Sequence, residues 1–133
     1  MKALFLMLGL CVAVTDQAKA QTASTPDRND YAFCSERPAE PEYLENMDMR
    51  DAHRRILVQR MYTEAALKAV VETGDCACET RFPPWDAAIE RYLNIHAGTS
   101  ERWEILELTS SYRKTANDYR KIARPICVEE GNW

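Results

Sequence analysis

Cysteine spacing constrains the fold of this chain more than any other feature of its 133 residues. One cysteine, Cys11, lies in an apolar N-terminal stretch, and four follow it: Cys34, Cys76, Cys78 and Cys127. An even number of cysteines in an exported chain is typical of disulfides, so we expect two bridges. A Cys76–Cys78 bridge would close a very small, strained ring. The favoured pairings therefore join Cys34 and Cys127 each to one member of the Cys-Ala-Cys pair, in an order that stays open.

The first 20 residues resemble a cleavable export signal. Lys2 provides a positive start, residues 3–14 are almost entirely apolar, and Ala18 and Ala20 are the small residues that a signal peptidase recognises. Cleavage is expected between Ala20 and Gln21. The mature chain is therefore predicted to be periplasmic or secreted.

Two membrane-anchored alternatives are disfavoured. A lipoprotein signal would acylate Cys11, but Leu10 stands where a small residue is wanted. A transmembrane anchor needs about 20 apolar residues, and this run is shorter. No later stretch is long enough to span a membrane, so we expect a soluble protein, and peripheral membrane contact stays open.

The four mature thiols have two other uses to consider. A structural zinc ion takes four tetrahedral ligands, but two residues or more usually separate its paired cysteines, whereas one separates Cys76 from Cys78. Reactive dithiols normally open a helix on a scaffold that contains strands, and the sequence has no alternating strand pattern. We therefore expect neither a metal nor another cofactor.

The mature chain is small and acidic. Residues 1–20 contain two of the 17 basic and one of the 21 acidic residues, so their removal changes the net charge from −4 to −5. This balance argues against a nucleic-acid-binding protein, whose affinity depends on clustered Lys and Arg. A chain of this size forms one domain with a modest core, which disulfides help to stabilise.

Three helices are predicted between residues 48 and 133. The first begins at about Asp48, a suitable cap, and runs to Glu72, and Gly74 ends it. Residues 56–71 are apolar or small around most of the helix, which is typical of a central helix.

The second helix follows Pro83-Pro84 and ends at Gly98. Helical spacing gives it one apolar stripe. The stripe consists of Trp85, Ala88, Ile89, Tyr92, Leu93 and His96.

The third helix begins after a cap at Thr99 or Ser100 and runs to about Arg124, where Pro125 is expected to break or kink it. Its apolar seam is wide. The seam consists of Ile105, Leu108, Tyr112, Ala116, Tyr119, Ile122 and Ile126, with Trp103 and Leu106 beside it.

These elements predict an all-α fold: a small three-helix bundle with an extended N-terminal arm, stapled by two disulfides. The cleaved signal occupies residues 1–20, the proline-interrupted arm 21–47 and the helical domain 48–133. Short connections make the first and third helices parallel, so their C-terminal ends meet. An extended arm of roughly 46 Å is long enough to run back along a first helix of about 37 Å, which brings all four cysteines to one pole.

Most titratable residues are expected to have structural uses. His53 and His96 have no nucleophile or carboxylate at a catalytic spacing, and the helix dipole favours a partly positive His96 in its last helical turn. Glu101, Glu104 and Glu107 are expected on a solvated face. We found no catalytic residue to name.

Ion pairs within helices are expected for the basic residues. The most basic stretch contains Arg50, His53, Arg54, Arg55 and Arg60, and an acidic partner or anionic lipid is the alternative use for it. Arg55 is expected to pair with Asp51, and Arg91 with Asp86 or Glu90.

Rigid aromatic segments near the cysteine pole are the best candidates for partner binding. They are Phe82, Pro83, Pro84 and Trp85 in one turn, and Trp133 at the chain end. Aromatic anchors of this kind are frequent in protein interfaces. In the alternative interpretation, Phe82 and Trp85 only cover the disulfides.

We predict an exported, non-catalytic interaction or accessory protein of a bacterial cell-envelope assembly, with a secretion or conjugation apparatus as one setting. Its partners are then envelope proteins, and its oligomeric state stays open. One alternative is a small periplasmic or secreted enzyme, or an enzyme inhibitor, that acts at the cell wall; Tyr112, Tyr119 and the face of Glu101 to Glu107 would line its pocket. A periplasmic stress chaperone is a further alternative.

Overall fold

The computed structural model describes residues 34–35 and 37–133. Six helical segments follow one another along them: α1 (Glu42–Glu45), the 3-10 helix η1 (Met49–Asp51), α2 (Ala52–Thr73), α3 (Cys78–Arg81), α4 (Asp86–Ile95) and α5 (Arg102–Glu129). No strand occurs in this part of the chain, so the all-α prediction is confirmed. The predicted signal and the first part of the predicted arm lie outside the described residues.

Helix α2 begins and ends where its capping residues predict. The Asp48 carboxylate accepts a hydrogen bond from the Arg50 backbone N–H at 2.9 Å, and η1 leads from there into α2. At the other end, Gly74 has φ 69°, and its N–H donates to the Val70 carbonyl at 2.8 Å. Glycine adopts this left-handed conformation without a steric penalty, which is why the helix stops there.

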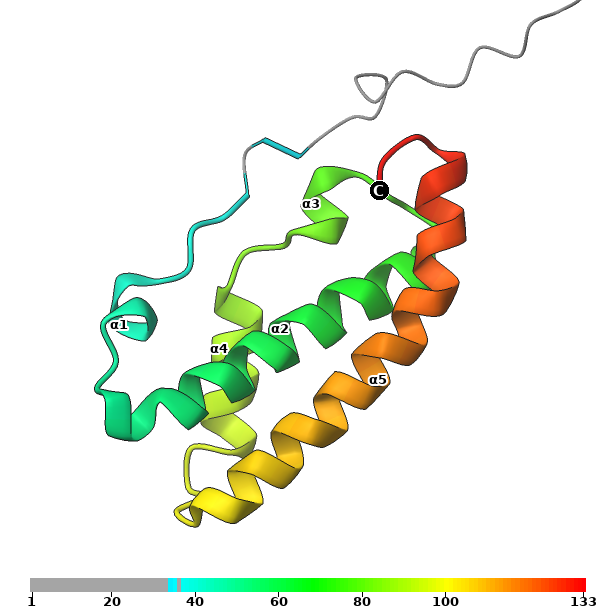
Figure 1. Ribbon diagram of the computed structural model, residues 1–133. Coiled ribbons are helices and arrows are strands. Elements are labelled where there is room, and N and C mark those ends of the chain that lie inside the picture. Colours follow the sequence, from blue (N-terminus) through cyan, green and yellow to red (C-terminus); the bar gives the residue numbers. More distant parts are fainter. Residues whose placement is uncertain (1–33, 36) are drawn as a thin grey trace, which may run out of the picture.

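Helix α2 is the central element of the bundle. It contacts η1, α3, α4 and α5 (Figure 1). The side chains that it buries lie on several sides of the helix: Leu57, Val58, Met61, Glu64, Ala66 and Val70. Burial on several sides confirms the central position predicted for residues 56–71.

The two long helices, α2 and α5, lie side by side and run parallel (Figure 1). One core cluster joins the beginnings of the two helices through Leu57, Met61 and Ile105. The other joins their ends through Val70, Cys76, Ala123 and Cys127. The expected meeting of the C-terminal ends is therefore confirmed.

Two disulfides close this end of the molecule. Cys34 is bonded to Cys78 and Cys76 to Cys127, and both pairs have Cα atoms 5.4 Å apart. This pairing is one of the two that the spacing favoured. We call this end, with α3 and residues 130–133, the disulfide pole.

The arm returns along α2 to the disulfide pole, as its length predicts. Near the beginning of α2, the Glu40 carboxylate accepts hydrogen bonds from Arg55 at 2.7 Å and Gln59 at 3.1 Å. Further along, the Pro38 carbonyl accepts a hydrogen bond from Trp85 Nε1 at 3.2 Å. From Cys34 onward, the arm therefore runs antiparallel to α2.

Helix α5 differs from its predicted bounds at both ends. It begins at Arg102 after Glu101, which makes no side-chain cap, so neither Thr99 nor Ser100 caps it. It also continues through Pro125 to Glu129. Proline removes one helical hydrogen bond, but the following turn is held by buried Cys127 and its disulfide.

The buried seam of α5 is narrower than predicted. Its fully buried members are Ile105, Ala116, Ala123 and Cys127. By contrast, Trp103 is 62% exposed, Leu106 50% and Ile122 51%. Helix α4 is short and packs mainly on α2, which leaves the outer face of α5 uncovered. Leu93, predicted in the stripe of α4, is also 59% exposed.

Candidate functional site

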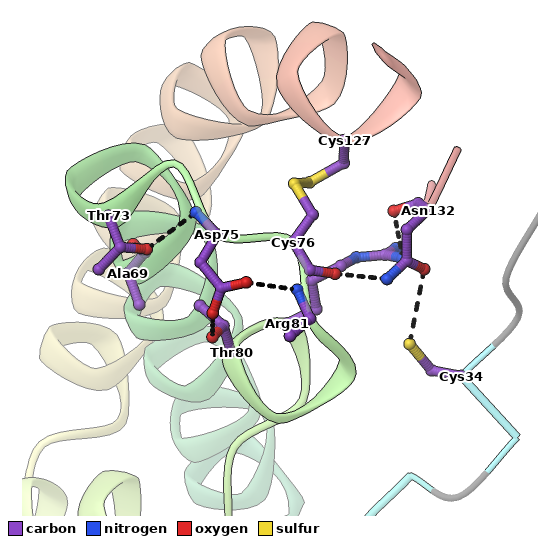
Figure 2. Close-up of a disulfide and its surroundings, with 10 residues drawn as sticks. Cys34, Ala69, Thr73, Asp75, Cys76, Thr80, Arg81, Cys127 and Asn132 are labelled. Atoms are coloured by element: carbon purple, nitrogen blue, oxygen red, sulfur yellow. Dashed lines mark hydrogen bonds between the residues drawn. A yellow bond between two sulfur atoms is a disulfide. The ribbon is translucent and has the colours of Figure 1, made fainter. Parts of the chain in front are cut away.

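The disulfide pole begins with a set of local caps that turn the chain from α2 into α3. The Thr73 hydroxyl accepts a hydrogen bond from the Asp75 N–H at 3.1 Å, and Asp75 Oδ1 accepts one from the Ala77 N–H at 2.9 Å (Figure 2). The Thr80 hydroxyl donates to Asp75 Oδ2. The hydrogen bond from Thr80, followed by that from Ala77, lowers the pKa of the Asp75 carboxyl. These bonds orient the Cys76-Ala77-Cys78 segment.

Asn132 links the segments that carry the disulfides. Its side-chain amide donates to the Cys76 carbonyl, and its backbone N–H donates to the Cys127 carbonyl at 2.7 Å (Figure 2). The latter bond and the one from Gly131 to Val128 form a Schellman motif at the end of α5. Asn132 Oδ1 also lies 3.7 Å from Cys34 Sγ, which has no proton to donate because it is bonded to Cys78.

Arg81 is held by the same asparagine. Its Nη1 donates to the Asn132 backbone carbonyl at 2.6 Å and to Oδ1 at 2.9 Å. Asn132 is only 9% exposed, so these bonds satisfy polar groups that are out of contact with water. The guanidinium of Arg81 therefore has a defined position at the pole.

Two guanidinium groups stack on the aromatic rings of the pole. The Arg37 guanidinium carbon lies 4.1 Å from the centre of the Phe82 ring. That of Arg81 lies 5.2 Å from both the Phe82 and the Trp133 ring centres. Burial, and then the charge of Arg37, lower the pKa of Arg81, although arginine stays charged at neutral pH.

A groove of about 220 Å³ opens beside these rings, between α2, α3 and the chain end. Its apolar lining consists of Tyr62, Ala66, Leu67, Val70, Phe82 and Trp133. Its polar lining consists of Thr63, Arg81 and Arg120. The groove therefore combines an apolar floor with two cations and has no carboxylate among its lining side chains.

The residues predicted for partner binding are divided between two places. Phe82 and Trp133 line the groove. Trp85 instead stacks on Tyr62 with ring centres 4.0 Å apart, and the Pro83 carbonyl accepts a hydrogen bond from the Tyr62 hydroxyl at 2.9 Å. Pro84 is exposed and lines neither this groove nor the depression that contains Trp103.

Arg81 begins the aromatic turn singled out in the sequence but was given no role of its own, and Arg120 was not singled out. Arg81 resembles an ordinary charged residue there, because its partner Asn132 is 51 residues away. Arg120 lies on α5, far from the aromatic turn in sequence. The nearest signal was the predicted convergence of the cysteines, which brings Arg81 and the chain end together.

The buried polar groups of the other end form a chain between helices. His96 Nε2 lies 3.0 Å from the Tyr112 hydroxyl, and the Arg91 guanidinium carbon lies 5.3 Å from the Tyr112 ring centre. Arg91 also donates to the Glu64 carboxylate at 2.9 Å. Burial, and then the charge of Arg91, lower the pKa of His96.

Two sequence-based expectations are wrong at this polar chain. A partly positive His96 was expected from the helix dipole, but burial, and then the charge of Arg91, lower its pKa and disfavour the charged form. Arg91 pairs with Glu64, not with Asp86 or Glu90. The reason is that Arg91 points across to α2 instead of along its own helix.

The basic residues at the beginning of α2 are used structurally. Arg55 pairs with Glu40 of the arm at 2.7 Å, so the expected pair with Asp51 is wrong. Asp51 instead lies 3.8 Å from Arg54, which also donates to the Thr99 carbonyl at 2.9 Å. These contacts join the arm and the α4–α5 connection to α2.

The residues predicted to line an enzyme pocket do not line one common pocket. Glu104 and Glu107 line a shallow depression with Thr99, Trp103, Leu108 and Ser111, and neither Tyr112 nor Tyr119 lines it. Within residues 34–35 and 37–133, no group of three His, Cys, Asp or Glu side chains is arranged to hold a metal ion. Nor does this part of the chain contain a helix with the length and apolar character needed to cross a membrane.

Comparisons with known proteins found no matching family model, no matching curated protein and no matching solved structure.

Proposed function

We propose that this chain is an exported, non-catalytic interaction or accessory protein of a bacterial cell-envelope assembly, with a secretion or conjugation apparatus as one setting. Export is supported by the signal-like first 20 residues together with the two disulfides. Disulfides persist in oxidising compartments such as the periplasm and are rare in the reducing cytosol.

The observation that carries the interaction role is a group of exposed apolar side chains around the α4–α5 connection. Leu93 is 59% exposed, Ile95 58%, Trp103 62% and Leu106 50%. We call these four residues the apolar end. Exposed apolar side chains are frequent in surfaces that bind other proteins, and tryptophan is common at the centre of such surfaces.

The positions of the titratable groups favour a binding protein over an enzyme. Glu64 is bonded to Arg91, His96 to Tyr112 and Glu40 to Arg55. Each of these contacts joins two helices or joins the arm to a helix. The most buried acidic and imidazole groups of the described residues therefore serve to hold the fold together.

Site-specific photo-crosslinking in intact bacteria tests the proposal. A photoreactive amino acid replaces Trp103 or Leu106 in the apolar end, and Lys114, an exposed residue further along α5, provides the matched control. We expect crosslinks to an envelope protein from positions 103 and 106 and none from 114. Equal crosslinking from all three positions, or none from 103 and 106, would contradict the interaction role of the apolar end.

Export is tested separately by fractionation and intact mass. The protein is expected in the periplasmic or secreted fraction, beginning at Gln21, with a mass lower by four hydrogens than that of the reduced mature chain. Retention of residues 1–20, or four free thiols in the exported protein, would overturn this part of the proposal.

A further inference from the structure

Arg81 differs from the other half-buried basic side chains of the described residues. Arg54, Arg55, Lys68 and Arg91 each have a carboxylate oxygen within 4.0 Å. Arg81 has none among those residues, and its hydrogen-bond partners are both neutral oxygens of Asn132. A half-buried charge is stabilised by an opposite charge, so an anion is the missing partner that this environment favours.

The donors of Arg81 are suitable for such an anion. A guanidinium has five N–H groups in a planar fork, and only Nη1 is used by the described residues. The bonds to Asn132 and the stacking on Phe82 and Trp133 hold the group in place before any ligand arrives. The Arg81 guanidinium therefore loses little side-chain entropy when it binds a carboxylate.

The groove adds a second, independent requirement. Beside Arg81 it offers an aliphatic floor of Ala66, Leu67 and Val70, with Phe82 and Trp133 at its sides. Arg120 supplies a further cation from α5, and its one side-chain hydrogen bond to the described residues goes to the neutral Asn117 side chain at 2.6 Å. A ligand that fits both features has an apolar body and a single negatively charged end.

The volume limits the size of that ligand. The groove has a volume of about 220 Å³. It is smaller than the pockets that enclose drug-sized ligands. A molecule with on the order of ten non-hydrogen atoms, part of it outside the groove, is the appropriate size.

We propose that the groove at the disulfide pole binds a small amphiphilic carboxylate, a short alkyl or aryl acid, whose carboxylate pairs with Arg81 and whose apolar body lies on Ala66, Leu67 and Val70. This site lies apart from the apolar end. The ligand proposal is therefore independent of the protein partner proposed above.

The test compares octanoate with octanamide, which has the same number of non-hydrogen atoms but no charge. Both are titrated into the mature, disulfide-bonded protein and followed by two-dimensional NMR of the backbone amides and the Trp133 indole. We expect octanoate to bind with a Kd on the order of 0.1 to 1 mM, because ligands of this size give only modest affinity. Octanamide should bind at least tenfold more weakly.

Arginine variants locate the charge. Arg81→Gln should bring the affinity for octanoate down to that for octanamide, and Arg120→Gln should have a smaller effect. Arg124→Gln, an exposed residue of α5 that does not line the groove, is the matched control and should bind normally. If Arg81→Gln does not fold, the comparison of the two ligands on the unmodified protein still decides the question.

Three results would overturn the proposal. The first is equal binding of octanoate and octanamide, and the second is a set of NMR shifts outside the groove. The third is self-association through Trp133, seen by sedimentation without ligand, which would assign the groove to a second copy of the chain.

Discussion

The double substitution Cys76→Ala, Cys127→Ala removes one disulfide and is expected to lower the free energy of unfolding by about 4 kcal/mol. The bridge joins residues separated by 51 positions. In the chain-entropy model, closing a loop of that length in the unfolded chain stabilises the folded protein by about 4 kcal/mol. Both cysteines are almost fully buried beside Val70 and Ala123. Their replacement also removes sulfur atoms from the core, so we expect a loss of at least this size.

The matched comparison is Cys34→Ala, Cys78→Ala. Its bridge spans 44 positions, and the same calculation again gives about 4 kcal/mol. Here, however, loss of the disulfide frees the N-terminal arm in the folded protein. The arm then gains conformational freedom in the folded state as well as in the unfolded state. The loss should therefore be clearly smaller than for the other bridge.

Urea denaturation followed by far-UV circular dichroism measures both losses by linear extrapolation. Thiol titration and intact mass confirm that the remaining bridge has formed in each variant. A larger loss for the Cys34–Cys78 variant would refute the reasoning. So would a loss under about 1 kcal/mol for the Cys76–Cys127 variant, because the loop-closure term alone exceeds it.

Three further perturbations follow from local features. Asn132→Ala leaves the Cys76 carbonyl without its donor and removes one of the two oxygens that accept from Arg81, so it should lower the unfolding free energy by about 2 to 4 kcal/mol. Asn117→Ala, at an exposed position, should change it by less than about 0.5 kcal/mol. Urea denaturation measures both. Burial lowers the pKa of His96, so the unfolded chain binds more protons than the folded protein, and stability should fall as pH drops below about 6.5. Denaturation at several pH values should show a weaker fall for His96→Gln. An identical pH profile for the two proteins would exclude His96 as the cause. Gly74→Ala places a side chain at φ 69° and should lower the melting temperature through a loss of about 1 kcal/mol, while Gly98→Ala, which has no positive φ, should not.

The fold was largely predictable because its determinants are local. Asp48 and Gly74 mark the ends of the first long helix by their own capping chemistry. Helix order and the length of the arm then bring the cysteines together without any knowledge of side-chain packing. The pairing itself was not predictable, since Cys76 and Cys78 are separated by one residue. It depends on Cys76 turning into the core cluster with Val70 while Cys78 begins α3.

The extent of α5 and its buried face depend on tertiary contacts that a local pattern does not contain. Pro125 is a strong local signal to stop, but the disulfide at Cys127 holds the next turn in a helix. Trp103 and Leu106 extend the apolar pattern, although no helix within residues 34–35 and 37–133 covers them. The groove was missed for the same reason, because Arg81 acquires its surroundings from Trp133 and from Asn132, which is 51 residues further along the chain.

The shared Cys76-Ala77-Cys78 segment has a consequence for how the chain responds to proteolysis. The two bridges overlap along the chain, since Cys34 reaches past Cys76 to Cys78 while Cys76 reaches forward to Cys127. A protease that cuts one peptide bond anywhere between Cys34 and Cys127 therefore leaves two pieces that remain covalently joined. Such a nicked molecule would migrate as one band on a non-reducing gel and as two after reduction. Release of a fragment from the region between these two cysteines requires two cuts or a reductant.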